Sequence, residues 1–143
     1  MPSAHHTELF NCTVPEFFKI VSDYERYPEF LTEVKECRVV KNENGRKLVE
    51  YKVSMIKSFS YSLWMKEQEP NLITWDFASG DIFKSMSGSW KLSPEADKCR
   101  VTYDVDATFG IFVPGPIAKT LLTVNLPTMM GAYHKRVKEI YGK

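Results

Sequence analysis

The 143-residue sequence lacks the features that mark secreted, membrane-spanning and disulfide-rich chains. Its three cysteines are widely separated and form no CxxC pair, so reduced, buried thiols are expected rather than disulfides or a zinc site. No apolar run approaches the roughly 20 residues that a membrane span needs. The first ten residues, MPSAHHTELF, contain neither the basic nor the apolar segment of a signal peptide. We therefore expect an intracellular, cytoplasmic protein.

An excess of charge of either sign is also missing. The chain has 19 basic and 18 acidic side chains, and the two signs alternate without a basic block, which gives no electrostatic case for DNA binding. It has no glycine-rich phosphate loop. His5, His6 and His134 have no partner nearby in the sequence that would suggest a catalytic triad or a metal site. We predict no catalytic residue, metal or cofactor. Ring-closing chemistry that needs only a shaped pocket and a tyrosine hydroxyl would leave no motif.

Hydrophobic residues make up 43% of the chain and aromatic residues 13%, which is typical of a folded protein, and the length suits a single domain over residues 1–143. Apolar and polar residues alternate with period two in several runs, which predicts half-buried strands joined by short polar turns. About seven such strands, all antiparallel, are expected. Their cores lie at 6–12, 35–41, 49–55, 59–65, 73–77, 86–92 and 101–109.

Two regions break this alternation. In residues 13–31, Thr13 is a suitable N-cap, and the stretch SDYERYPEFL (22–31) predicts a corner where one helix ends before Pro28 and a second begins there. Residues 117–141 predict one long helix with a kink at Pro127. The expected fold class is therefore α+β, with a long C-terminal helix laid across one face of a curved antiparallel sheet.

This order of elements resembles the helix-grip fold of the START-like superfamily. Three segments are similar to motifs of its polyketide cyclase/dehydrase group, in the branch that contains coenzyme Q-binding (Coq10-like) and ribosome-association-toxin (RatA-like) proteins. They are VSDYERYPEFL (21–31), similar to V-x-D-x-E-x-Y-P-x-F-L; WDF (75–77), FK (83–84) and GSWKL (88–92), similar to F-K-x-L-x-G-x-W-x-F; and AYHKR through YG (132–142), similar to A-F-x-x-R-A-x-x-L-Y-G. The chain departs from the branch at residues 32–34, where it reads TEV, and at the prolines of 114–116 and 127.

The resemblance implies a cavity between sheet and helix, filled either by a ligand or by side chains that form a solid core. Most residues predicted to face it are apolar, with phenol and indole groups able to form a few hydrogen bonds. The predicted ligand-binding residues are Tyr27, Phe30, Tyr51, Phe59, Tyr61, Trp75, Phe77, Met86, Trp90, Tyr103, Val105, Leu121, Val124, Met129 and Tyr133. Tyr27, Phe30 and Leu31 would either gate the entrance or plug it.

From these features we expect a protein that binds or transports a hydrophobic small molecule such as a lipid, a quinone (ubiquinone in the Coq10-like case) or a polyketide-like compound. An aromatase/cyclase-like enzyme and a RatA-like protein that contacts the ribosome are the alternatives. The near-neutral charge disfavours the ribosome. Transient contact with a membrane surface during loading stays open.

Overall fold

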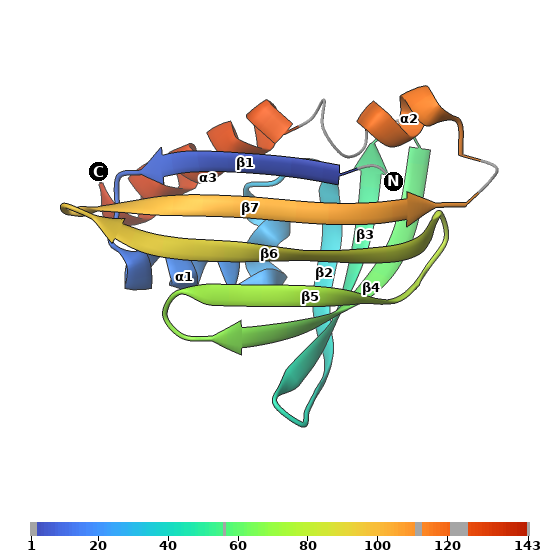
Figure 1. Cartoon of the computed structure of the whole chain (residues 1–143), viewed down its shortest axis with the longest axis horizontal. Coiled ribbons are helices and arrows are strands. Elements are labelled where there is room, and N and C mark those ends of the chain that lie inside the picture. The colour runs from blue at the N-terminus through green and yellow to red at the C-terminus, as the bar shows by residue number, and fades with distance from the viewer. Residues whose placement is uncertain (1–2, 56, 111–112, 121–125, 143) are drawn as a thin grey trace.

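The structure is a computed structural model that describes residues 3–55, 57–110, 113–120 and 126–142. Its elements follow the order strand, two short helices, six strands, two helices (Figure 1). They are β1 (Ser3–Phe10), α1 (Val14–Val21), the 3₁₀ helix η1 (Tyr24–Glu29), β2 (Val34–Glu43), β3 (Arg46–Met55), β4 (Lys57–Gln68), β5 (Leu72–Gly80), β6 (Phe83–Glu95), β7 (Lys98–Phe109), α2 (Gly115–Lys119) and α3 (Leu126–Tyr141).

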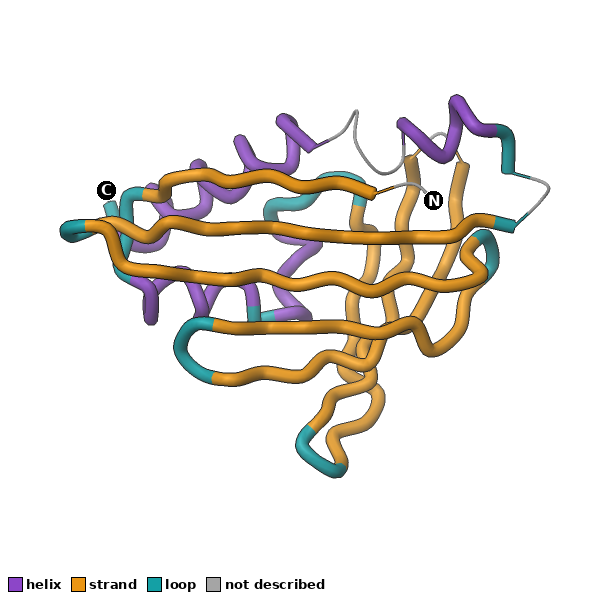
Figure 2. The backbone as a smooth tube through the Cα atoms, viewed as in Figure 1, coloured by secondary structure: helices purple, strands orange, loops and turns teal. Residues whose placement is uncertain are grey.

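The seven strands form one antiparallel sheet in the order β1-β7-β6-β5-β4-β3-β2, so the predicted α+β helix-grip fold is confirmed. Strands β1, β7, β6 and β5 run across the view of Figure 1, whereas β2, β3 and the first part of β4 cross them steeply, and β4 then bends to run beside β5. Irregularities in register at Ser62/Leu63 in β4 and at Phe83/Ser85 in β6 add local bends. A strongly bent sheet presents a hollow face, and the helices lie on one side of it (Figure 2).

Helix α1 begins as predicted. The Thr13 hydroxyl accepts a hydrogen bond from the Glu16 amide, and the Glu16 carboxylate accepts one from the Thr13 amide, which satisfies two N–H groups that a helix start leaves free. The apolar side chains of α1, among them Phe17 and Phe18, are buried against the sheet. The helix thereby fixes the chain direction into the corner that follows.

The first helix ends before Pro28, as predicted, but the predicted start of the second helix at Pro28 is wrong. Helix α1 already ends at Val21, where the Ser22 hydroxyl donates to the carbonyl oxygen of Phe18 at 2.7 Å. The second helix, η1, begins at Tyr24 and contains Pro28 next to its last residue. A 3₁₀ helix this short tolerates proline near its end, because losing one N–H there removes a single hydrogen bond.

The predicted helix over 117–141 is described in two pieces. Residues 121–125 lie outside the described residues, and Pro127 is the second residue of α3 rather than a kink within a described helix. Along α3 the buried residues are Met130, Tyr133 and Val137, spaced three and four apart as a helix face requires. None of the helices in the described part of the chain is long and apolar enough to cross a bilayer.

The three cysteines are buried, as the sequence predicts. His5 and His6 both belong to β1, which pairs with β7 along its whole length. The His6 Nε2 lies 2.7 Å from Glu8 Oε1, and His134 Nε2 on α3 lies 2.6 Å from Glu8 Oε2. Glu8 therefore joins α3 to β1, although no local sequence pattern marks this side chain as special.

Candidate ligand-binding site

A cavity of about 140 Å³ lies between the hollow face of the sheet and α3. Strands β3 to β7 supply its floor, and α3 covers it with Met129 and Tyr133. Tyr27 of η1 and Leu31 close one side. The lining residues are Tyr27, Leu31, Val34, Tyr51, Tyr61, Met65, Trp75, Met86, Trp90, Tyr103, Val105, Met129 and Tyr133.

Strand register explains why these side chains converge. Residues paired across antiparallel strands project to the same face, so a row of partners lines one surface. Met65 pairs with Trp75, Trp75 with Gly88, and Gly88 with Val105, giving one inner-face row across four strands. Trp90 pairs with Tyr103, and Tyr51 with Tyr61, whose rings stack with centroids 5.0 Å apart. The sheet therefore gathers aromatic rings from separate strands into a single wall.

The structure brings most of the predicted binding residues around this cavity. These are Tyr27, Tyr51, Tyr61, Trp75, Met86, Trp90, Tyr103, Val105, Met129 and Tyr133. Sequence reasoning missed Val34 and Met65 as lining residues, and it placed Leu31 only at the entrance. Met65 stands in the same alternating run as Tyr61, so its period-two position was the available signal. Val34 begins β2, where only the tertiary position of the corner brings it to the cavity.

Three predicted residues are not among those that line the cavity. Phe30 packs edge-on against Tyr133 with ring centroids 5.3 Å apart. Phe59 is buried and stacks against Tyr61, and Phe77 contacts Phe83 edge-on. Leu121 and Val124, also predicted to face the cavity, lie outside the described residues.

The cavity lining carries no charged side chain among the described residues. Burial raises the pKa of Tyr103 to about 12, and it raises the pKa values of Tyr27, Tyr51, Tyr61 and Tyr133 further. Burial disfavours the ionised form of a phenol, so all five hydroxyls stay protonated at neutral pH. Such a lining supplies hydrogen-bond donors to a neutral molecule, and it offers no general base.

Three of the hydroxyls already have partners. The Tyr27 hydroxyl donates to the backbone carbonyl of Val21, the Tyr133 hydroxyl is hydrogen-bonded to Tyr27, and the Tyr51 hydroxyl lies 3.8 Å from the sulfur of Met65. The indole Nε1 of Trp75 is fully buried and has no hydrogen-bond partner among the described residues. Most polar groups of the wall are therefore already engaged within the protein.

The corner at residues 22–31 is held in place by several polar contacts. The Tyr24 hydroxyl donates to the Glu67 carboxylate of β4 at 2.7 Å. The Arg136 guanidinium of α3 binds the Glu29 carboxylate at 2.7 Å and lies over the Phe30 ring, 5.0 Å from its centroid. These contacts tie η1 to both the sheet and α3 at the side of the cavity that Tyr27 closes.

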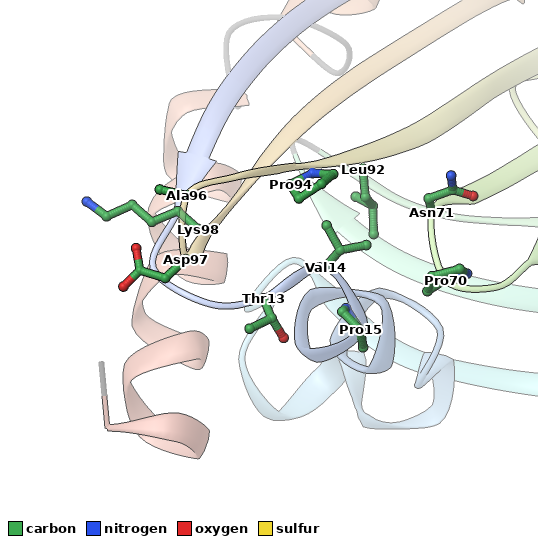
Figure 3. Close-up of a pocket in the computed structure, with 10 residues that line it drawn as sticks. All are labelled: Thr13, Val14, Pro15, Pro70, Asn71, Leu92, Pro94, Ala96, Asp97 and Lys98. Atoms are coloured by element: carbon green, nitrogen blue, oxygen red, sulfur yellow. The ribbon is translucent and has the colours of Figure 1, made fainter.

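A second, larger hollow of about 410 Å³ lies at the end of the molecule where α1 begins (Figure 3). Its lining comes mainly from the turns before β5 and β7, and only Val14 and Leu92 among its residues are buried. The rest are exposed residues such as Pro70, Pro94 and Lys98. We assign the ligand site to the aromatic cavity despite its smaller volume, because apolar groups there are withdrawn from water and donors converge.

No group of three or more histidine, cysteine or acidic side chains is placed to hold a metal ion within the described ranges. The charged groups near α3 have partners outside the cavity lining: Glu8 binds His134, and Arg136 binds Glu29. The candidate site therefore rests on shape, aromatic surface and neutral hydrogen-bond donors alone.

A bent antiparallel sheet that holds an apolar cavity under its C-terminal helix defines the START-like, helix-grip class of proteins. A family model described as polyketide cyclase/dehydrase and lipid transport matches residues 11–132. The chain belongs to this family.

Relatives within the family are similar over almost the whole chain. The persistence and stress-resistance toxin PasT of Escherichia coli O6:H1 is 26% identical, with 99% of this chain and 90% of that protein covered. The ribosome association toxin RatA of Escherichia coli is 25% identical, with the same coverage. These similarities place the chain near the RatA-like branch.

Solved structures show the same fold. A START superfamily protein from Mycobacterium smegmatis aligns with a TM-score of 0.86 at 25% identity, covering 96% of this chain and 98% of that one. An aromatase/cyclase, Zhui, from a Streptomyces species aligns with a TM-score of 0.71 at 15% identity, covering 94% and 85%. The second similarity concerns the fold alone.

Proposed function

We propose that this protein binds a small, uncharged, mainly apolar molecule in the cavity between the sheet and α3, and that it acts as a carrier for that molecule. The observation that carries the proposal is the cavity itself, lined by aromatic side chains and by no charged group among the described residues. Burying an apolar ligand there contributes about 25 cal/mol per Å² of its surface. Protonated tyrosine hydroxyls would orient its polar end.

Size limits the ligand more than chemistry does. The cavity of about 140 Å³ is comparable to the roughly 150 Å³ engineered cavity that holds one benzene, and it is below the roughly 300 Å³ at which most ligand pockets begin. One ring with short substituents fits within the described residues. A whole lipid, a complete ubiquinone or a multi-ring polyketide exceeds this limit.

Carriage fits the site better than ring-closing catalysis. A cyclase mechanism that removes a proton needs a base, and a phenol with a raised pKa is a poor one at neutral pH. The cavity has no carboxylate or imidazole among its described lining residues to take that role.

Native mass spectrometry of the purified protein, followed by organic extraction, tests the proposal directly. A stoichiometric, co-purifying neutral compound with one ring is the expected result. Protein that carries nothing and that takes up neither small aromatic compounds nor an environment-sensitive dye would contradict it, and the aromatic residues would then form a solid core.

Association with the ribosome is a second candidate function. It is favoured by the relatives RatA and PasT, which match 99% of the chain, although their identity is only 25–26%. The net charge of +1 disfavours it. Co-sedimentation with purified ribosomes at low and physiological salt distinguishes the two: ribosome binding that survives cavity substitutions would place this function on the outer surface.

A further inference from the structure

The solvent-accessible part of the cavity lining is confined to a few residues. Most lining residues are at most 6% exposed, among them Tyr27 and Leu31 at the corner. The remaining lining residues are half-buried, and they are Val34, Tyr61, Met86, Tyr103 and Met129. The mouth of the cavity therefore lies toward these residues, and two of them are methionines, Met86 on β6 and Met129 in the first turn of α3.

Other sulfur groups of the described core are shielded from solvent. Met65, which also lines the cavity, is 3% exposed, and Met130, the neighbour of Met129 on α3, is 2% exposed. Met86 and Met129 are therefore the lining methionines that a small oxidant in solution reaches most easily.

The cysteines are less reactive toward an oxidant than their number suggests. All three are buried, and burial raises the pKa of Cys37 and of Cys99 to about 12. The thiolate is the nucleophilic form of cysteine, so a thiol that stays protonated at neutral pH reacts slowly. Mild oxidation should therefore modify the methionines at the mouth before it modifies these thiols.

A peroxide converts a methionine thioether to a sulfoxide. The sulfur lone pair attacks one oxygen of hydrogen peroxide, and an S–O bond forms as the O–O bond breaks. The hydroxide that leaves takes the proton of the transferred hydroxyl and becomes water. The sulfur is oxidised by two electrons and the peroxide is reduced. A flexible apolar side chain thereby becomes a polar one with a strong hydrogen-bond acceptor.

A sulfoxide at the mouth has donors within the lining. The hydroxyls of Tyr61 and Tyr103 form no hydrogen bond with another described residue, whereas the other lining tyrosines have partners. A sulfoxide oxygen competes with a ligand for these two donors. If it stays in the apolar lining without a hydrogen bond, its desolvation is unfavourable. Both arrangements lower the affinity of the cavity for a neutral, mainly apolar molecule.

Resting on the proposed function, we propose that Met86 and Met129 form a peroxide-sensitive modification site at the mouth of the cavity, and that their conversion to sulfoxides releases the bound ligand. The carrier then unloads under oxidising conditions. Because methionine sulfoxide reductases restore the thioether, the change is reversible.

Hydrogen peroxide treatment of the purified full chain, followed by peptide mass mapping, gives the extent of oxidation at each methionine. We expect Met86 and Met129 to gain oxygen before Met65 and Met130. Acetophenone, a neutral single-ring compound, serves as the ligand probe, and NMR titration measures its affinity before and after treatment. Oxidation should lower this affinity by at least about 5-fold, the effect of leaving one polar group without a hydrogen bond. Incubation with a methionine sulfoxide reductase should restore it.

Leucine is close to methionine in volume and has no sulfur to oxidise. The double variant Met86→Leu/Met129→Leu should therefore keep its affinity for acetophenone after the same treatment. Met55→Leu is the matched control, because Met55 is half-buried and does not line the cavity. This variant should lose affinity on oxidation as the wild type does. Reversal by the reductase tests the same point in the wild type without any substitution.

Three results would overturn the proposal while leaving the cavity intact. They are unchanged acetophenone affinity in oxidised, folded wild-type protein, oxidation of Met65 and Met130 as fast as that of the mouth methionines, and an equal loss of affinity in the double variant. Unfolding of the wild type on oxidation would overturn it as well, because the sulfoxides would then disrupt the core. If untreated, folded wild-type protein does not bind acetophenone or another neutral single-ring compound, the proposed function itself fails before any oxidation.

Discussion

Trp75 and Gly88 show how a single residue can depend on the absence of a side chain on the next strand. Glycine in a strand interior lowers stability in general, so its presence here has a local reason. The space above Gly88 is filled by the Trp75 indole, and a Cβ there would also lie 2.5 Å from the backbone oxygen of Asp104. The position of the Trp75 indole is therefore determined by its packing over Gly88 on the neighbouring strand.

Gly88→Ala should therefore destabilise the protein by about 1–3 kcal/mol, the range for an added group that forces packed atoms apart. The same change should displace the indole and weaken the binding of any cavity ligand. Urea denaturation measures the first effect, and NMR titration with acetophenone measures the second. Gly131→Ala is the matched control, since a Cβ at this exposed position of α3 meets nothing within 4 Å. Because alanine favours a helix, this control should gain up to about 1 kcal/mol. Equal effects at the two positions would refute the packing argument.

At the scale of elements, α3 is held to β1 by the carboxylate of Glu8, which binds both His6 and His134. Partial burial acts to raise the pKa of Glu8, but hydrogen bonds and charge interactions with these two histidines outweigh it and lower the pKa below its usual value. A carboxyl whose pKa is lower in the folded state stabilises the fold above its unfolded-state pKa. That contribution is lost as the pH falls through the folded-state pKa.

Glu8→Gln should accordingly lower the free energy of unfolding at neutral pH by about 0.5–1 kcal/mol, as for other partly exposed ion pairs. The difference from wild type should shrink as the pH falls below the usual glutamate pKa of 4.5. Denaturation at a series of pH values measures it. Glu43→Gln, at an exposed end of β2, is the control and should show no such trend. A difference between Glu8→Gln and wild type that does not change with pH would contradict the role of the carboxylate charge.

Arg136 joins a second pair of elements, η1 and α3. Its side chain is 14% exposed, binds Glu29, and lies over Phe30. Arg136→Ala should cost about 1–2 kcal/mol through the lost ion pair and cation–π contact. Arg136→Lys keeps the charge and loses the planar group, so its cost should be smaller. Thermal and urea denaturation of both variants measure these costs.

The same variants test whether the corner gates the cavity or plugs it. If Tyr27 and Leu31 move aside for a ligand, loosening the corner in Arg136→Ala should increase the rate at which acetophenone leaves, as seen by NMR line shape. An unchanged rate in a destabilised variant would indicate a plug, with the entrance elsewhere.

At the scale of the whole molecule, period-two patterning was enough to predict the fold, because alternation specifies which side chains of a strand share a face. It was not enough to delimit the site. Phe59 and Phe77 alternate in step with the lining residues of their strands, yet they pack against Tyr61 and Phe83 and do not line the cavity, because alternation gives the face of a side chain and not its distance from the cavity. The packing of Trp75 depends on its register with Gly88, and the placement of His134 depends on Glu8. Such long-range pairings are not encoded in any local pattern.

Cavity volume supplies a final prediction, which concerns the size of the natural ligand. Each methylene buried by a ligand adds about 0.8 kcal/mol. In a series of phenyl ketones with lengthening alkyl chains, affinity should therefore rise at first and then stop rising once the cavity of about 140 Å³ is filled. Isothermal titration across the series, with the matching alkylbenzenes as controls for the carbonyl, locates that point. If affinity kept rising with every added methylene, the alkyl tail would extend beyond the cavity and bind elsewhere on the protein. A lipid-like molecule would then be the better candidate for the natural ligand than a single-ring compound.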